Sequence, residues 1–263
     1  VFRDSSIRIM PLANVDKSPE KIVIHLDQHP NTVDQLILSA YYYGYETIEI
    51  ASKNSIEQET RRRIRKIMVS LSGTEIVTED EQHIVIKVML NKSKVNILQT
   101  FYRISLIIEM SIEALVNEMD WQEIKLNEDE IDRLYHLIVK IISTALSDAN
   151  ILESSGIGQI TIIPSLFLIN KRLENLGDNI KRIGRYKRDE KIALRPQEQS
   201  VLFLVRDELK RTTSYMLGKQ NTSFVPMDDK FVQQAKETVS HTTHKGLQTL
   251  LFEVVRHVQN IQE

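Results

Sequence analysis

The sequence contains no cysteine among its 263 residues. This absence excludes disulfide bonds, thiolate metal ligands and cysteine nucleophiles from any account of the protein. It fits a reducing compartment, and we therefore expect a cytoplasmic protein. Any metal site has to be built from oxygen and nitrogen ligands, and any catalytic nucleophile has to be something other than a thiol.

The sequence also lacks a strong net charge and a long hydrophobic run. The formal charge is −2 and the isoelectric point is near 6.4, so no global field attracts nucleic acid or an anionic membrane. The most hydrophobic stretch, residues 160–169, is too short to span a bilayer and contains Pro164 and Ser165. We therefore expect no membrane insertion.

The sequence pattern of the N-terminal third predicts a small α/β domain, which we place at residues 1–90. Strands rich in branched apolar residues alternate with amphipathic helices, and one helix is expected to end at Gly44. A second helix is expected from residue 55 to residue 70, with Ser55 and Gln58 forming a capping box. The expected strands are residues 6–10, 21–26, 46–51, 74–78 and 83–88, the last two forming a hairpin.

Strand patterns disappear after about residue 92, and apolar residues then recur at spacings of three and four. This periodicity predicts an all-α antiparallel bundle over residues 91–263, because helices joined by short loops tend to pack antiparallel. The predicted fold class is therefore α+β. The expected helices cover residues 95–116, 126–146, a third helix that ends near Gly184, residues 197–217 and most of residues 228–263.

Two carboxylate pairs stand at the same spacing on two of these helices. Glu128 and Asp132 are four residues apart, and so are Glu174 and Asp178. Each pair occupies one face of its helix, beside the apolar stripe. Several carboxylates close together are what oxygen-preferring metal ions require. Gly177 then permits close helix approach or access to the metal, although it costs about 1 kcal/mol in a helix interior.

The same pairs have a simpler interpretation as solvated surface charge. In that case Glu174 and Asp178 form ion pairs with Lys171, Lys181 or Arg182. If the metal interpretation holds, His136 lies one turn beyond Asp132 and is a weaker candidate for a nitrogen ligand.

These two segments resemble the PhoU family of helical proteins associated with phosphate homeostasis. LENLGDN at residues 173–179 and EDEIDRLYHLI at residues 128–138 are similar to the family's two carboxylate motifs. The resemblance covers about residues 92–187, a three-helix unit. It implies iron, zinc or similar metal ions as cofactors. The metal ligands that it implies are Glu128, Asp132, Glu174 and Asp178.

The family repeats its three-helix unit, and the second unit here, at about residues 196–263, is degenerate. It keeps Glu253 but has His257 where aspartate is expected, so this pair is a weaker metal candidate. Asp228 and Asp229 are weak candidates for the other half.

The N-terminal segment is similar to the one that precedes the helices in archaeal PhoU-like regulators, which usually begin with an AbrB-type DNA-binding domain. Residues 5–11 resemble a remnant of the last AbrB strand, and the start at Val1 rather than methionine favours a missing upstream part.

The resemblance implies a non-enzymatic, metal-binding regulator of phosphate uptake. We expect a homodimer that contacts a phosphate transporter's ATPase or a sensor protein. The alternative is a DNA-binding transcriptional regulator with a PhoU-like sensing and dimerisation domain. The basic run at residues 61–66 then contacts phosphate groups, whereas otherwise it is a solvated face. A third reading is a ferritin-like metalloenzyme, which needs Glu-x-x-His pairs, whereas Glu253 and His257 are four apart.

Overall fold

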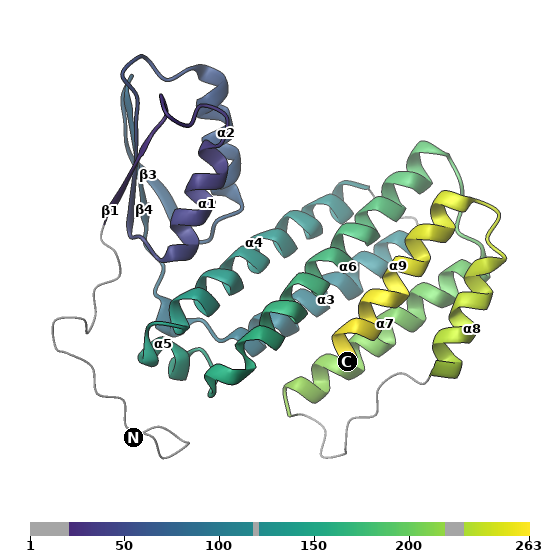
Figure 1. Ribbon diagram of the computed structural model, residues 1–263. Coiled ribbons are helices and arrows are strands. Elements are labelled where there is room, and N and C mark those ends of the chain that lie inside the picture. The colour runs from purple at the N-terminus through teal and green to yellow at the C-terminus, as the bar shows by residue number, and fades with distance from the viewer. Residues whose placement is uncertain (1–20, 118–120, 219–228) are drawn as a thin grey trace. The chain divides into compact units, whose positions relative to one another are not determined.

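The computed structural model describes residues 21–117, 121–218 and 229–263 (Figure 1). They form two compact units. The first unit contains residues 21–97 and His136–Ile163, and the second contains Leu98–Tyr135 and Pro164–Glu263. A sheet lies in the first unit and long helices make up the second, which confirms the predicted α+β class. The domain boundary expected at residue 90 stays a prediction.

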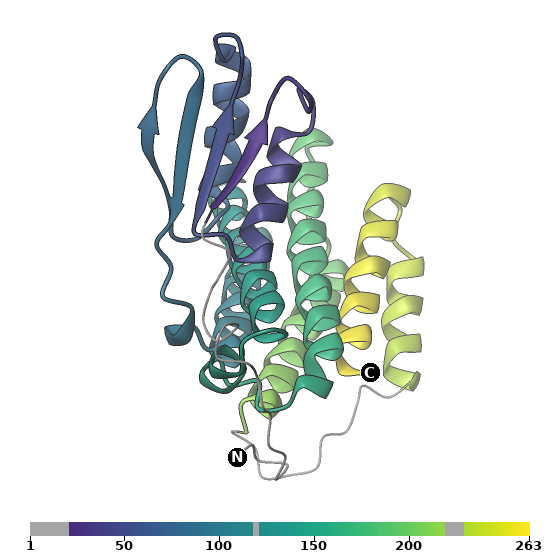
Figure 2. The same ribbon diagram turned by 60° about the vertical axis from the view of Figure 1, so that its left-hand side comes forward.

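A sheet with the order β1-β2-β4-β3 forms the centre of the first unit. The chain passes from β1 through α1 to β2, which pairs parallel to β1, and β4 pairs antiparallel to both β2 and β3. Helices α1 and α2 lie on one face of the sheet (Figures 1 and 2). The elements are β1 (Lys21–His25), α1 (Val33–Tyr43), β2 (Thr47–Ala51), α2 (Gln58–Val69), β3 (Thr74–Glu79) and β4 (His83–Val88).

The core of this unit follows from the alternation of the central strands. Ile48 and Ile50 of β2 and Ile84 and Ile86 of β4 are buried, while the residues between them are more exposed. Gly44 ends α1 in the left-handed conformation, with φ of 92°, as expected.

The start of α2 corrects the sequence-based expectation. The helix begins at Gln58, with Glu57 at the capping position, and no side chain accepts a capping hydrogen bond. The predicted capping box of Ser55 and Gln58 is therefore wrong. The backbone N–H of Ile56 donates instead to the carbonyl oxygen of Glu81 at 2.7 Å, so the loop before the helix is fixed by the β3–β4 turn.

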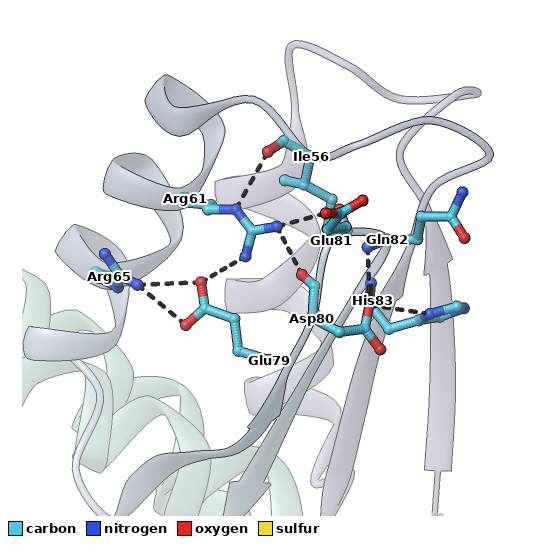
Figure 3. A network of polar contacts seen from close by, with 8 residues as sticks. All are labelled: Ile56, Arg61, Arg65, Glu79, Asp80, Glu81, Gln82 and His83. Carbon is cyan, nitrogen blue, oxygen red and sulfur yellow. Dashed lines mark hydrogen bonds and ion pairs between the residues drawn. The ribbon is translucent and has the colours of Figure 1, made fainter.

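The basic run of α2 is engaged in ion pairs (Figure 3). Arg61 donates to Glu79 Oε1 at 2.6 Å and to the carbonyl oxygens of Asp80 and Glu81 at 2.6 and 3.1 Å. Arg65 also pairs with Glu79, and Arg61 and Arg65 together hold the pKa of that carboxyl below its usual value, with the Arg61 hydrogen bond as the largest cause. The other two arginines pair with acidic residues too: Arg62 with Glu59 and Arg63 with Asp34. Arg61, Arg63 and Arg65 therefore hold α2 to neighbouring elements, whereas the Arg62 pair lies within α2.

The second half of α4 (Trp121–Ala145) contributes a buried cation to the first unit. Lys140 is 1% exposed, and its Nζ donates to the carbonyl oxygen of Tyr41 at 2.7 Å. The ammonium also lies 4.3 Å from the centroid of the Tyr41 ring. Burial lowers the pKa of Lys140 to about 7.

The second unit is helical. It contains most of α3, the first half of α4 and α6 to α9. Helix α6 continues past Gly184, where the sequence predicted its end, and Gly184 packs against the indole ring of Trp121. The helical segment expected over residues 228–263 contains two helices in its described part. The bounds are α3 (Ile97–Val116), α6 (Ile163–Asp189), α7 (Pro196–Met216), α8 (Asp229–Ser240) and α9 (Lys245–Gln262), with the short α5 (Ala149–Ser154) in the first unit.

Helices α3 and α7 run antiparallel. Ser105 of α3 donates a hydrogen bond to Thr213 of α7 at 3.3 Å. About two turns further along α3, Glu113 forms an ion pair with Arg206, which comes earlier in α7. The predicted antiparallel bundle is confirmed for this pair. Within the described ranges, no helix combines the length and hydropathy needed to cross a bilayer.

Candidate metal centre

Helices α4 and α6 pack antiparallel along the segments that carry the carboxylate pairs. Residue numbers increase along α4 while those of the contacting residues in α6 decrease. The first of these contacts is between Trp121 and Gly184. The Arg188 guanidinium lies 4.9 Å from the centroid of the Trp121 ring. Further along, Glu128 forms an ion pair with Lys181, Ile131 faces Gly177, and the Tyr135 carbonyl accepts from Asn170. This register brings the two pairs opposite each other.

The two helices pack closely at Gly177. A Cβ atom at this position would lie 2.8 Å from Cδ1 of Ile131, which is closer than real contacts of this kind. The glycine therefore has a packing role. Its lack of a side chain lets α6 approach α4 next to the carboxylates, which outweighs its poor helix propensity.

The four predicted carboxylates come together in one cluster, which we call the carboxylate cluster: Glu128, Asp132, Glu174 and Asp178. Burial, as the largest cause, and the nearby charges of the other three carboxylates together raise the pKa of Asp132 to about 7. Burial likewise raises the pKa of Glu128, with Lys181 acting in the opposite direction and Asp178 within hydrogen-bonding reach.

Two lysines of α6 balance part of this negative charge. Lys181 of α6 forms an ion pair with Glu128 of α4. Its Nζ is also 3.8 Å from Asp178 Oδ1, which lies on α6. The Glu128 side chain is 6% exposed and that of Lys181 is 20% exposed, so this pair is largely withdrawn from water. Lys171 donates to Glu174 at 2.7 Å, but its side chain is 45% exposed.

The surface interpretation of the pairs is therefore incomplete. The expected pairing of Glu174 and Asp178 with Lys171, Lys181 and Arg182 does occur. The contact between Lys181 and Glu128 was missed, because it joins residues whose proximity depends on the register of two helices. No short-range sequence signal reveals it.

The donor set fits a metal ion in chemistry and in charge. Carboxylates from two facing helices are the ligands that hard cations prefer, and the Lys181 ammonium is already held among them as a cation. As the side chains stand, no three carboxylate or imidazole groups in the part of the chain that the structure describes converge on one point as metal ligands do. Metal binding at this cluster therefore requires a change of side-chain rotamers.

The weaker candidates lie elsewhere. His136 belongs to the first unit, where its Nδ1 is 2.5 Å from the Tyr42 hydroxyl. On α9, His257 Nε2 is 3.9 Å from Glu253 Oε2, and burial lowers the pKa of the imidazole. The buried His257 Nδ1 has no hydrogen-bond partner among the described residues.

The remaining predicted features lie at the edge of the described residues or outside them. Asp229 is the first residue of α8, while Asp228 and the proposed AbrB remnant at residues 5–11 lie outside the described residues. The archaeal and AbrB-type parts of the resemblance stay predictions.

Comparison with known proteins identifies the segment that holds the carboxylate cluster. The family model of the PhoU domain matches residues 97–186, which run from the start of α3 into the last turns of α6. No curated protein and no solved structure matches the chain significantly. Residues 97–186 therefore form a PhoU domain.

Proposed function

We propose that this protein is a non-enzymatic regulator of phosphate homeostasis that acts through contacts with other proteins. The observation that carries the proposal is the PhoU domain at residues 97–186, which contains both carboxylate pairs in facing positions. The PhoU family is a regulatory family whose members act through protein–protein contacts. The partner we propose is a phosphate transporter's ATPase or a sensor protein, met by a homodimer of this chain.

Metal binding through the carboxylate cluster is the second part of the proposal. Glu128 and Asp132 would hold the ion from α4, and Glu174 and Asp178 would hold it from α6. A bound iron or zinc ion would supply positive charge that joins the two helices. The position of the four carboxylates supports this role, because the charges of Glu128, Glu174 and Asp178 act on Asp132 and add to the effect of burial on its pKa.

Metal occupancy would affect partner binding through the α4–α6 pair. The two helices, of 25 and 27 residues, pack closely at Gly177, so a metal ion bound beside it would alter how they pack there. The cluster would then control the shape of the surface that a partner meets.

The DNA-binding alternative gains no support from the basic run, whose four arginines all have acidic partners. We therefore retain the protein-partner function as the proposal.

Elemental analysis of the purified chain tests the metal part. The matched variant is D132N/D178N, which removes two charges while keeping side-chain size. We expect near-stoichiometric transition metal in the wild type and its loss in the variant. Absence of bound metal in wild-type protein supplied with excess iron and zinc would refute metal binding.

The regulatory part needs a measurement in the host. Deleting the gene is expected to change how phosphate uptake responds to external phosphate, and the wild-type gene is expected to restore the response. Uptake that is identical with and without the gene would refute the proposed regulation, whatever the metal analysis shows.

A further inference from the structure

We propose that Lys181 is a resident counter-ion of the carboxylate cluster and that a metal ion has to displace its ammonium group in order to bind. The inference rests on the proposed metal binding and concerns how that binding is controlled. It assigns a competing cation, supplied by the chain itself, to the site that the metal would use.

The position of Lys181 on α6 gives it access to both helices. Its Nζ forms an ion pair with Glu128 of α4 and lies 3.8 Å from Asp178 Oδ1, one turn earlier on α6. A single ammonium therefore contacts one carboxylate from each pair. A metal shared between the two helices would use the same oxygen atoms, so the ion and the ammonium group exclude each other.

Burial distinguishes this contact from an ordinary surface ion pair. Exposed pairs contribute little because water and salt screen them. The Glu128 side chain is only 6% exposed, so removing its cation leaves a desolvated charge without compensation. Lys171 is different because its side chain is 45% exposed and contacts Glu174 at the edge of the cluster.

Asp132 offers one more carboxyl group to a stronger cation. Among the described residues, Asp132 forms no ion pair, although Glu128, Glu174 and Asp178 all lie near it. Lys181 brings a single positive charge to four carboxylates. A divalent ion brings two and contacts more oxygen atoms, which is why it can win the exchange despite the cost of breaking the Lys181–Glu128 pair.

The exchange has a consequence at the surface. An ammonium group expelled from the cluster would turn towards solvent on α6, on the same stretch of helix as the exposed Arg182 and Arg185. Metal binding inside the cluster would then add a positive charge to the surface that already carries these two arginines. A partner with an acidic surface would detect that charge without contacting the metal.

Isothermal titration of the metal-free full chain with Zn²⁺ tests the proposal. The K181M variant keeps the length of the side chain but removes its charge, and we expect it to bind Zn²⁺ about tenfold more tightly than the wild type, or about 1.4 kcal/mol. K181R keeps the charge and is expected to bind like the wild type. K171M is the matched control at the edge of the cluster, with a change of less than about threefold, as for an exposed pair.

Thermal unfolding gives a second readout that does not depend on the titration. Without metal, K181M is expected to melt below the wild type, because the buried Glu128 loses its cation. With saturating Zn²⁺ this difference is expected to disappear. Equal affinities of wild type and K181M would overturn the counter-ion role while leaving metal binding intact. No binding by either protein would overturn the proposed metal function, and the exchange with it.

Discussion

Asp132 is a buried carboxyl group surrounded by three other carboxylates, so its ionisation opposes folding. Its pKa in the native state is about 7, above the value in the unfolded chain. Between these two values the native state holds a proton that the unfolded state has released. Stability contributed by this group is therefore present at low pH and is lost as the pH rises towards about 7.

We expect the D132N variant to remove this dependence. In metal-free buffer, the free energy of unfolding of the wild type should fall relative to that of D132N as the pH rises from the usual aspartate range to about 7. Urea unfolding over this range measures the difference. Parallel pH profiles for the two proteins would show that Asp132 is ionised in the native state.

The pKa shift of Lys140 changes stability with pH in the opposite direction to that of Asp132. Burial lowers its pKa to about 7, so between that value and the usual lysine value the unfolded state holds a proton that the native state lacks. This group therefore favours stability increasingly as the pH rises above about 7. At neutral pH we expect K140M to be more stable than the wild type by on the order of 1 kcal/mol.

The Tyr41 carbonyl stays satisfied in K140M, because the backbone N–H of Gly44 also donates to it at 3.2 Å. Urea unfolding at neutral and alkaline pH measures both the gain and its decline with pH. A loss of stability in K140M at neutral pH would show that the hydrogen bond and the Tyr41 ring contact outweigh the burial of the charge.

At the scale of elements, the closeness of α4 and α6 depends on Gly177. We expect G177A to lower the free energy of unfolding by about 1 kcal/mol, because the clash with Ile131 exceeds the gain in helix propensity. In an I131V background the close Cδ1 atom is gone, and the same glycine-to-alanine change should become neutral or stabilising. A double-mutant cycle by urea unfolding measures this coupling. Additive effects would rule out the steric explanation.

The attachment of α2 to the β3–β4 turn depends on Arg61. We expect R61A to cost about 2 kcal/mol, because its guanidinium group satisfies the Glu79 carboxylate and several backbone carbonyl oxygens. The adjacent R62A is the control. Arg62 is 69% exposed and lies 3.6 Å from Glu59, so its removal should change stability by less than about 0.5 kcal/mol. Equal effects of the two changes in thermal unfolding would contradict the structural role of Arg61.

Over the whole molecule, sequence patterns predicted the structural features that depend on residues close together in the chain. The end of α1 was predictable because glycine readily adopts the left-handed conformation seen at Gly44. The facing carboxylate pairs were predictable too, because spacings of four beside an apolar stripe fix the side of the helix on which a residue lies.

Features that depend on tertiary register were not predictable. The sequence predicts a helix end at Gly184, although this is the position where the Trp121 ring packs against α6. The Lys181–Glu128 pair depends on how α4 and α6 align, and Ser55 failed as a cap because a contact with the β3–β4 turn fixes the preceding loop. In each case a distant residue decides the outcome.

The contact between Trp121 and Gly184 gives the protein an intrinsic fluorescent probe. Trp121 is the single tryptophan of the sequence, so selectively excited fluorescence comes from one ring. That ring lies between α4 and α6, beside the Arg188 guanidinium, on the same pair of helices as the carboxylate cluster. The wavelength and intensity of its fluorescence emission should therefore report whether α4 and α6 stay packed against each other, without an attached dye.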